Sequence, residues 1–347
     1  MDHQVNIAKL QRATRRNVFS TVEGHSLCLS NPTRSTPAVN QPRLSIAICA
    51  YNEENTIGPL LNNLVTQQDL STDTEILVMC DGCTDKTEEI VRSFSEKDSR
   101  VKMMREPERQ GKATALNRLL KLYTGDVFIH LDADHLPSKG AILRLVNRLD
   151  HSGVGAAQGC QTPFAQNGFM GRISVTVCGL HNYTQRYLSS RAIAQHLGGG
   201  LFAIKRGVCD QIPEDIVNDD AYLGVACKLR NLRVIFEENA KVYFQSPRTL
   251  LEFLAQRRRI VFGHLKVQRE TGVTPMVLEM CPAKHRVRIL IEWFAKNPTT
   301  IPSFFVCVLL ELHVNLRARI DLMRKTTQHT TWGIAKTTKL ARSRTTT

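Results

Sequence analysis

The stretch Phe128-Ile129-His130-Leu131-Asp132-Ala133-Asp134-His135-Leu136-Pro137 decides how the rest of the chain is interpreted. Its first four residues are mostly apolar and predict a buried strand, and Pro137 is expected to stop regular pairing. Side chains alternate along an extended chain, so Asp132 and Asp134 are expected on the same side. Two carboxylates followed by the imidazole of His135 suit a hard divalent cation, Mg²⁺ or Mn²⁺, with open positions for a phosphate-bearing ligand. A solvated acidic loop is the alternative that this stretch alone leaves open.

The composition indicates a globular protein with anionic partners. The chain has 347 residues, 42% of them hydrophobic and 22% charged, which is enough for one large domain with appendages or for two domains. The formal net charge of +14 favours nucleic acid, anionic lipid or phosphorylated substrates as partners. Residues 1–43 are polar and basic without an apolar run of signal-peptide length, so we expect a disordered basic leader there.

Strands and helices alternate before this stretch. Short apolar runs predict strands at residues 44–50, 75–80, 101–105 and 127–131, and helical patterns follow the first three, beginning near residues 57, 86 and 112. This alternation is typical of an α/β fold with a mostly parallel sheet. Ligands of such sheets bind at the carboxyl ends of the strands. The polar clusters at 51–53, 81–85 and 132–135 all fall there, so a binding site is predicted at this edge of the sheet.

Beyond residue 150 the pattern is looser. The expected elements are a strand at 154–160, a helix at 168–190, a glycine loop leading into a strand at 197–205, a helix opened by 214–220, two short strands at 233–237 and 241–245, and a helix at 250–267.

Six motifs carry a resemblance to a known family. They are Ala-Tyr-Asn-Glu-Glu at 50–54, Asp-Gly-Cys-Thr-Asp at 81–85, Gly-Lys-Ala-Thr-Ala-Leu-Asn at 111–117, Asp-Ala-Asp-His at 132–135, Asn-Asp-Asp at 218–220 and Gln-Arg-Arg-Arg-Ile at 256–260. In this order they resemble a family 2 glycosyltransferase of the GT-A fold, with a catalytic domain at 44–270. The motifs at 132–135 and 256–259 are similar to the cellulose and hyaluronan synthase branch. The resemblance implies an inverting, metal-dependent transferase that moves a sugar from a nucleoside diphosphate sugar to an acceptor.

The chain departs from the family pattern at three residues. Cys80 and Cys83 stand where the family usually has the first Asp and the Ser of Asp-Asp-Gly-Ser, and Ile260 stands where Gln-x-x-Arg-Trp has its Trp. The multiple membrane helices of the processive synthases are not predicted either. A long secreted polymer is therefore not the expected product.

The resemblance also implies a nucleotide site. It is expected to comprise Ala50, Tyr51, Asn52, Glu53, Asp81, Lys112 and Asp132. The Asp81 carboxylate would accept the N3 proton of uracil, which makes a UDP-sugar the expected donor, and Lys112 at a helix N-terminus suits a phosphate. For Asp81 a simple turn role is the alternative, for Tyr51 ordinary packing, and for His135 a structural hydrogen bond in a loop.

Two further motifs are assigned to the acceptor side by the resemblance. Asp220 would be the general base and Asp219 its support, because adjacent carboxylates raise each other's pKa; a helix N-cap is the alternative. Gln256 and Arg259 would hold the acceptor and the diphosphate. Three arginines in a row, 257–259, cannot all face one way on a helix, so a basic surface for membrane or nucleic acid also stays open.

Residues 271–347 are expected to be membrane-associated. Residues 287–294 are largely apolar with Glu292 inside the segment, and the apolar run 301–310 is broken by Glu311 and His313. A spanning helix needs roughly 20 mostly apolar residues. We therefore expect a pair of amphipathic helices that are interfacial or re-entrant. From Arg317 to Thr347 eight Lys or Arg and one Asp give a formal charge of +7, which suits an anionic cytoplasmic leaflet. The predicted enzyme is cytoplasmic, peripheral or monotopic, and acts on a hydroxyl or lipid-linked acceptor.

Two other functions fit parts of the sequence. A sugar nucleotidyltransferase would also bind nucleotides with an α/β fold, but it requires a Gly-rich phosphate loop near the first strand, and residues 50–53 are not one. A basic nucleic-acid-binding protein agrees with the net charge, but aromatic residues make up only 6% of the chain and no recognition module is present. Nucleic acid is therefore not an expected partner.

Overall fold

The computed structural model describes residues 42–194, 196–324 and 336–339. Most of the predicted leader at 1–43 and much of the predicted basic tail lie outside the described residues. The elements follow one another as β1 (Leu44–Ala50), α2 (Ile57–Gln67), β2 (Glu75–Asp81), α3 (Thr87–Ser95), β3 (Val101–Glu106), α4 (Lys112–Leu122), β4 (Val127–Leu131), β5 (His135–Pro137), α5 (Ala141–Leu149), β6 (Val154–Pro163), α6 (Gly168–Ser189), β7 (Leu201–Lys205), α7 (Asp219–Leu229), β8 (Arg233–Phe244), α8 (Leu250–Thr271), α9 (Ala283–Lys296), α10 (Ile301–Met323) and the short 3₁₀ turn η2 (Lys336–Lys339).

Eight strands form one sheet in the order β3-β2-β1-β4-β7-β6-β8-β5. Strands β3, β2, β1 and β4 run parallel to one another, as do β6 and β8. Strand β7 is antiparallel to both of its neighbours, and the edge strand β5 is antiparallel to β8. The prediction of a mostly parallel sheet is confirmed. Because β7 runs the other way, its first residues meet the last residues of β4 at one edge of the sheet.

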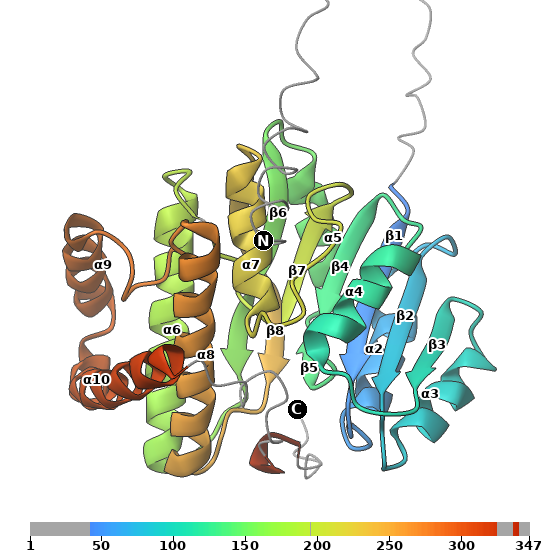
Figure 1. Cartoon of the computed structure of the whole chain (residues 1–347), viewed down its shortest axis with the longest axis horizontal. Coiled ribbons are helices and arrows are strands. Elements are labelled where there is room, and N and C mark those ends of the chain that lie inside the picture. Colours follow the sequence, from blue (N-terminus) through green and yellow to red (C-terminus); the bar gives the residue numbers. More distant parts are fainter. Residues whose placement is uncertain (1–41, 195, 325–335, 340–347) are drawn as a thin grey trace, which may run out of the picture.

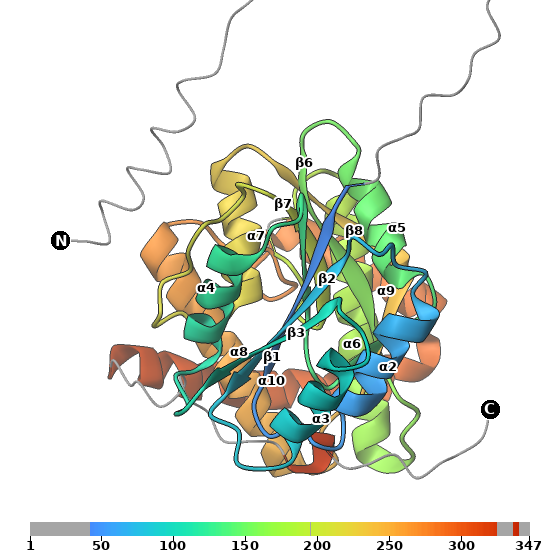
Figure 2. The ribbon, with the colours of Figure 1, turned by 90° about the vertical axis from the view of Figure 1, so that its right-hand side faces the viewer.

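Alternating side chains of the strands fill two apolar layers. In β1, Ile46 and Ile48 pack in the layer of α2, α3 and α5, whereas Ala47 belongs to the layer of α4, α6 and α7. All three side chains are fully buried, which explains why residues 44–50 are continuously apolar. Figures 1 and 2 show the layers, with α4 and α7 on one side of the sheet and α2, α3 and α5 on the other. The polar side chains that form the candidate site therefore follow the ends of the strands.

Two strands differ from expectation. His135–Pro137, expected to be part of an acidic cluster outside the strands, forms the short edge strand β5, which ends at Pro137 as expected. The strands expected at 233–237 and 241–245 are one strand, β8, because register shifts against β6 take up the residues between them.

Helices α9 and α10 lie beside α6 and α8, far from β3 (Figure 1). The predicted pair of C-terminal helices is present, but α10 reaches from Ile301 to Met323, well past the expected 301–310. Glu311, which interrupts the apolar run, does not interrupt the helix, because Glu is a good helix former, and its charge is paired with Arg257. Among the described residues, Pro298–Met323 is the one helix long and apolar enough to cross a membrane, judged by length and composition alone, and 11% of its most apolar window is buried.

Candidate active site

Asp132, Asp134 and His135 gather at the carboxyl end of β4. One possible ligand atom from each lies within 4.8 Å of the others. The backbone N–H of His135 donates to the backbone carbonyl of Asp132 over 3.1 Å. The Nδ1 atom of the His135 ring lies 2.7 Å from the Asp134 carboxylate. Burial opposes charge on both side chains, but their mutual attraction outweighs it, lowering the pKa of Asp134 and raising that of His135. Two carboxylates and an imidazole at this spacing fit Mg²⁺ or Mn²⁺.

A buried histidine that the sequence analysis missed orients Asp132. His130 precedes it by two residues, is fully buried, and places its Nε2 atom 3.0 Å from Asp132 Oδ1. Lys112 Nζ donates to the same oxygen over 2.9 Å. Burial favours the neutral acid, but Lys112 and His130 outweigh it and hold the pKa of Asp132 well below its ordinary value. The Asp132 carboxylate is therefore charged and fixed in orientation.

Gly200 makes room for His135. Its φ is +91°, a backbone conformation that favours glycine, and a Cβ atom at this position would lie 2.6 Å from His135 Cδ2. The Gly200 carbonyl also accepts the Asp132 N–H over 3.0 Å. A side chain at position 200 would therefore push the imidazole away from the two carboxylates.

Gly200→Ala is expected to raise the Mn²⁺ concentration needed for half-maximal nucleotide binding. Disturbing the groups that orient a metal ligand typically costs about 10–100-fold in metal affinity. A titration of nucleotide binding against Mn²⁺ measures the shift. Gly207→Ala is the matched control, because its φ is +81° but no atom lies within 4 Å of its Cβ position. An equal shift in both variants would assign the effect to backbone strain and not to His135.

Lys112 joins two acidic groups that lie far apart in the sequence. It is the first residue of α4, and its Nζ atom lies 2.9 Å from Asp132 Oδ1 and 3.2 Å from Asp219 Oδ2. Burial disfavours the ammonium form, but the two carboxylates outweigh burial and raise the pKa of Lys112. The structure thus brings the predicted phosphate-binding lysine to the predicted metal ligands and to the predicted catalytic pair.

Asp219 and Asp220 are the first two residues of α7 and follow its N-cap residue, Asn218. Asp219 is buried, whereas Asp220 is half-buried, and both line the central cavity. Burial and the neighbouring Asp219 raise the pKa of Asp220 to about 7. A cavity carboxyl group with this pKa has the protonation behaviour of a general base near neutral pH.

The loops after β1 and β2 lie side by side. Asn52, with a φ of +53°, accepts the Thr84 N–H over 2.8 Å and donates to Thr84 Oγ1 over 3.1 Å. The Arg109 guanidinium lies 3.9 Å from the centroid of the Tyr51 ring, a cation–π contact that the sequence did not suggest. A Cβ atom at Gly82 would lie 2.3 Å from the backbone nitrogen of Arg109, so the glycine lets the loop after β3 approach the loop after β2.

Asp81 holds the loop that precedes α4. Its Oδ1 atom accepts the Gln110 N–H over 2.7 Å, and its Oδ2 atom accepts the Gly111 N–H over 2.8 Å. The Cys83 thiol, which replaces the family's serine, donates to the Ala50 carbonyl over 3.4 Å. Each carboxylate oxygen has a second lone pair, so the predicted uracil contact of Asp81 is chemically compatible with its structural role.

Glu53 is buried at the start of α2 and is paired with Lys339, far along the chain. It also accepts the Thr56 hydroxyl over 2.7 Å. Burial and the negative charge of Asp134 raise the pKa of Glu53 to about 7, and Lys339 opposes the rise. The described C-terminal piece therefore lies at the strand ends, where the nucleotide is expected (Figure 1).

The three consecutive arginines of α8 face three different partners. Arg257 and Arg258 pair with Glu311 and Asp321 of α10, each at 2.5 Å. Arg259 lines the central cavity; burial lowers its pKa, and the carboxylates of Asp220 and Asp219 oppose the decrease. The helix is therefore not simply a basic surface, because two of its arginines bind a neighbouring helix and the third faces the site.

The start of α7 is tied to α8. The Asn218 amide nitrogen donates to the Ile260 carbonyl over 3.0 Å, so the position where the family has its tryptophan supports Asn218–Asp220 through the backbone. Gln256, predicted to hold the acceptor, also lines the cavity.

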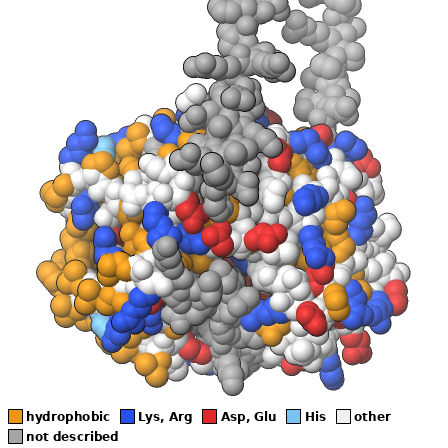
Figure 3. All heavy atoms as spheres, viewed as in Figure 1, with side chains coloured by type: hydrophobic (Ala, Val, Ile, Leu, Met, Phe, Trp, Pro, Cys, Tyr) orange, Lys and Arg blue, Asp and Glu red, His pale blue; other side chains and the backbone are white. Residues whose placement is uncertain are grey.

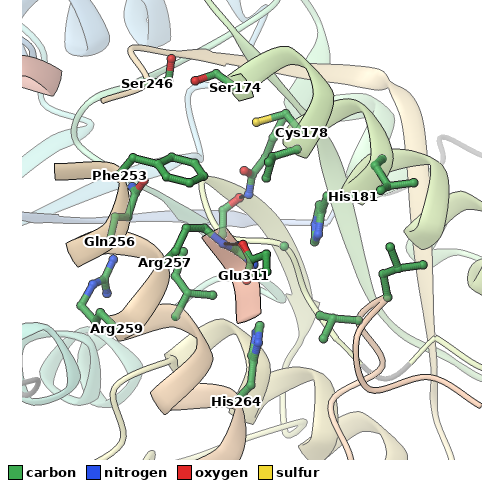
Figure 4. A pocket seen from close by; sticks show the side chains of 18 of the residues that line it. Ser174, Cys178, His181, Ser246, Phe253, Gln256, Arg257, Arg259, His264 and Glu311 are labelled. Atoms are coloured by element: carbon green, nitrogen blue, oxygen red, sulfur yellow. Dashed lines mark hydrogen bonds and ion pairs between the residues drawn. The ribbon is translucent and has the colours of Figure 1, made fainter. Parts of the chain in front are cut away.

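One cavity of about 770 Å³ collects these groups. Figure 4 shows its inner part, with Gln256 and Arg259 on α8 at one side and Cys178 and His181 on α6 at the other. Burial lowers the pKa of His181 to about 4, so this histidine is neutral. The predicted metal ligands line this cavity, as do Lys112, Asp219, Asp220, Gln256 and Arg259. Asp81, at the end of β2, and Tyr51, Asn52 and Glu53, in the loop after β1, are not among its lining residues.

Residues 45–212 match the profile of glycosyl transferase family 2. The chain carries a family 2 glycosyltransferase domain. The predicted resemblance is confirmed, and the family match favours it over the nucleotidyltransferase and nucleic-acid-binding alternatives. The mannosyltransferase PcManGT from Pyrobaculum calidifontis, solved in complex with GDP-Man and Mn²⁺, aligns with a TM-score of 0.55 and 21% identity over 93% of this chain and 86% of that one. This likeness shows the GT-A fold.

Two curated relatives are similar to the family 2 domain. The β-monoglucosyldiacylglycerol synthase of Nostoc sp. is 26% identical over 189 residues, which are 52% of this chain and 40% of that protein. The poly-β-1,6-N-acetyl-D-glucosamine synthase of Staphylococcus aureus is 24% identical over 225 residues, 63% of this chain and 54% of that protein. The chain thus spans about half the length of these relatives.

Proposed function

We propose that this protein is an inverting, metal-dependent glycosyltransferase. It transfers a sugar from a nucleoside diphosphate sugar, with UDP as the expected nucleotide, to the hydroxyl of an acceptor that is lipid-linked, at the cytoplasmic face of a membrane. The observation that carries the proposal is the meeting of Asp132–Asp134–His135, Lys112 and Asp220 in one cavity, although they come from three separate parts of the sequence.

The donor side of the site carries the groups that a diphosphate requires. Asp132, Asp134 and His135 would hold Mg²⁺ or Mn²⁺, and the bound ion would offset the charge that develops on the departing nucleoside diphosphate. In the PcManGT complex, Mn²⁺ accompanies the nucleotide sugar GDP-Man. Lys112, at the N-terminus of α4, and Arg259 add two positive charges on the chain itself.

The acceptor side carries the base. As the acceptor oxygen forms its bond to the anomeric carbon, the bond from that carbon to the diphosphate oxygen breaks, and Asp220 takes the hydroxyl proton. A single displacement of this kind inverts the anomeric configuration. Asp219 raises the pKa of Asp220 and pairs with Lys112, so it links the base to the donor side.

A panel of sugar nucleotides tests the proposal. The full chain is incubated with Mn²⁺ and UDP-glucose, UDP-N-acetylglucosamine or GDP-mannose, and release of nucleoside diphosphate is measured with and without chelator. Metal-dependent release from a UDP-sugar supports the proposal. Release from GDP-mannose alone would correct the nucleotide, and metal-independent release would overturn the metal assignment.

The rate of transfer is expected to rise with pH through about 7. Asp220 accepts a proton only when it is ionised, and burial together with Asp219 raises its pKa to about 7. Removing the neighbouring negative charge with Asp219→Asn lowers that pKa, so the inflection should move to lower pH. The pH profiles of kcat/KM for the two proteins measure this shift, and an unmoved inflection would show that another group titrates.

Binding to anionic vesicles is expected to depend on the outer face of α10. Phe305, Leu309 and Leu316 are exposed there, and full burial of one such side chain contributes about 1.5–3 kcal/mol. Replacing all three by Gln should weaken vesicle binding at least about tenfold, since about 1.4 kcal/mol is a tenfold change. Leu122→Gln on α4, where Leu122 is 53% exposed, is the control in the same sedimentation assay. Unchanged binding of the triple variant would rule out this face as the anchor.

A further inference from the structure

The central cavity does not end at the catalytic groups. Besides the metal ligands and Asp220, its lining includes Leu180 of α6, Leu290 of α9, and Phe304, Val308 and Leu312 of α10. We propose that this apolar arm of the cavity holds the hydrocarbon chain of a lipid acceptor, whose hydroxyl-bearing headgroup lies at Asp220. The inference rests on the proposed transferase function and specifies its acceptor as a lipid with a long alkyl or isoprenoid chain.

The two ends of the cavity differ in chemistry as such a molecule requires. The catalytic end presents carboxylates, a lysine and Arg259, which suit phosphate and hydroxyl groups. Helices α6, α9 and α10 contribute Leu180, Leu290, Phe304, Val308 and Leu312 to the lining, and they also contribute the polar Arg286, Asn315 and Arg319. Arg257, which also lines the cavity, is held by Glu311 at 2.5 Å and by Glu279 at 3.4 Å, so its charge is already balanced by the chain's own carboxylates.

The apolar arm opens onto an exposed apolar face. Val308 and Leu312 line the cavity and are also 36% and 64% exposed, so they form its rim. Phe305, Leu309, Leu312 and Leu316 recur at the spacing of one helix face, and Val287 and Ile291 of α9 are exposed as well. Figure 3 shows hydrophobic side chains gathered at this end of the molecule. Lipid can therefore pass from a membrane at this face into the cavity.

One side of α10 packs against α6 and α8, so the apolar face described above points outward. Val314 and Ala318 pack against Val261 and Phe262 of α8, and Cys307 packs against Ile173 of α6. The ion pairs of Arg257 and Arg258 fix the same side of α10 to α8. The exposed stripe is therefore the outer face of a docked helix, and large exposed apolar faces next to a binding cavity are typical of lipid or membrane contact.

An alkyl chain suits this arm better than a growing glycan does. A glycan requires hydrogen-bonding groups and aromatic platforms along its path, and Ile260 stands where the family's tryptophan would supply one. His181 and His264, which also line the cavity, are neutral because burial lowers their pKa. A hydrocarbon chain requires no polar partners from such walls.

Photolabelling tests the assignment. The full chain, bound to anionic vesicles, is labelled with hexadecanol that carries a diazirine at mid-chain, and the labelled peptides are mapped. Label is expected inside the cavity, on the α6 peptide around Leu180, as well as on α10. The double variant Val308→Trp/Leu312→Trp narrows the rim and should lower the α6 label at least fivefold. The matched control is Leu309→Trp/Leu316→Trp, because these leucines are 68% and 62% exposed but do not line the cavity.

The outcomes separate this inference from the proposed function. If the photolabel is found only on the exposed face of α10, at positions such as 305, 309 and 316, in every protein, this face only touches the membrane and the inference is overturned. The same holds if both double variants lose α6 label equally, or if cross-linked dimers show that a second copy covers the face. Metal-dependent release of nucleoside diphosphate is measured in the same proteins. Release without α6 label would refute the lipid arm alone, whereas α6 label without release would leave the arm standing and refute the transferase.

Discussion

Asp134→Asn is expected to remove metal-dependent turnover almost completely. The substitution keeps the shape of the side chain but removes one of the two carboxylates that would hold the cation, and a bound metal contributes several kcal/mol to charge stabilisation in the transition state. A loss of about 4 kcal/mol corresponds to roughly a thousandfold in rate. Turnover and the Mn²⁺ dependence of nucleotide binding are the measurements.

The fold should survive this change, because Asp134 lies on the surface of the cavity and not in either apolar layer. Circular dichroism and the melting temperature check this point. Asp73→Asn, on an exposed loop before β2, removes the same charge away from the site and should leave turnover unchanged. Full activity of Asp134→Asn, or of the unmodified protein in excess chelator, would remove the metal site from the proposal.

Asp220→Asn is expected to lower turnover by about 10²–10⁴-fold, which is the usual contribution of general base catalysis. The amide preserves the shape of the side chain but takes up no proton near neutral pH. The affinity for nucleoside diphosphate should change by less than tenfold, about 1.4 kcal/mol. Single-turnover rates and nucleotide titrations separate the two effects.

Asp219→Asn should cost less in turnover, because its role is to tune its neighbour. The structure adds that Asp219 contacts Lys112, which also contacts Asp132. The proposed catalytic pair is therefore not remote from the proposed donor side, although its distance in the sequence suggested so. Asp219→Asn is the change expected to disturb nucleotide affinity. If Asp219→Asn proves the more damaging in turnover, the two roles are reversed; if neither change matters, the pair serves only to stabilise the start of α7.

The alternating apolar runs were sufficient to predict the α/β fold and the edge of the sheet that carries the site. Strands buried on both faces read as continuous apolar segments, so residues 44–50 and 127–131 were recognisable. The register shifts of β8 were not, because they depend on pairing with β6. The length of α10 was underestimated for a similar reason, since Glu311 breaks an apolar run in the sequence but forms an ion pair in the fold.

The candidate site, like the fold, could be predicted only in part from the sequence. Motif order pointed to Asp132, Asp134, His135 and Asp220, which the structure brings together. His130 was counted as part of the buried strand, although its place two residues before Asp132 puts it on the same side and was a usable signal. The pairing of Glu53 with Lys339 left no local signal, because the two residues lie 286 positions apart.

The three arginines of α8 have a mechanical consequence. Successive residues of an α-helix are turned by about 100°, so Arg257, Arg258 and Arg259 engage different sides of one rigid rod, and none can move far without the others. A displacement of α10 that pulls on Glu311 or Asp321 is carried to Arg259 at the donor site. If α10 adsorbs to lipid as proposed, adsorption and capture of the donor would be linked equilibria, and by reciprocity each would change the affinity of the other by the same factor. The proposed membrane contact would then act on this enzyme as an effector as well as a support.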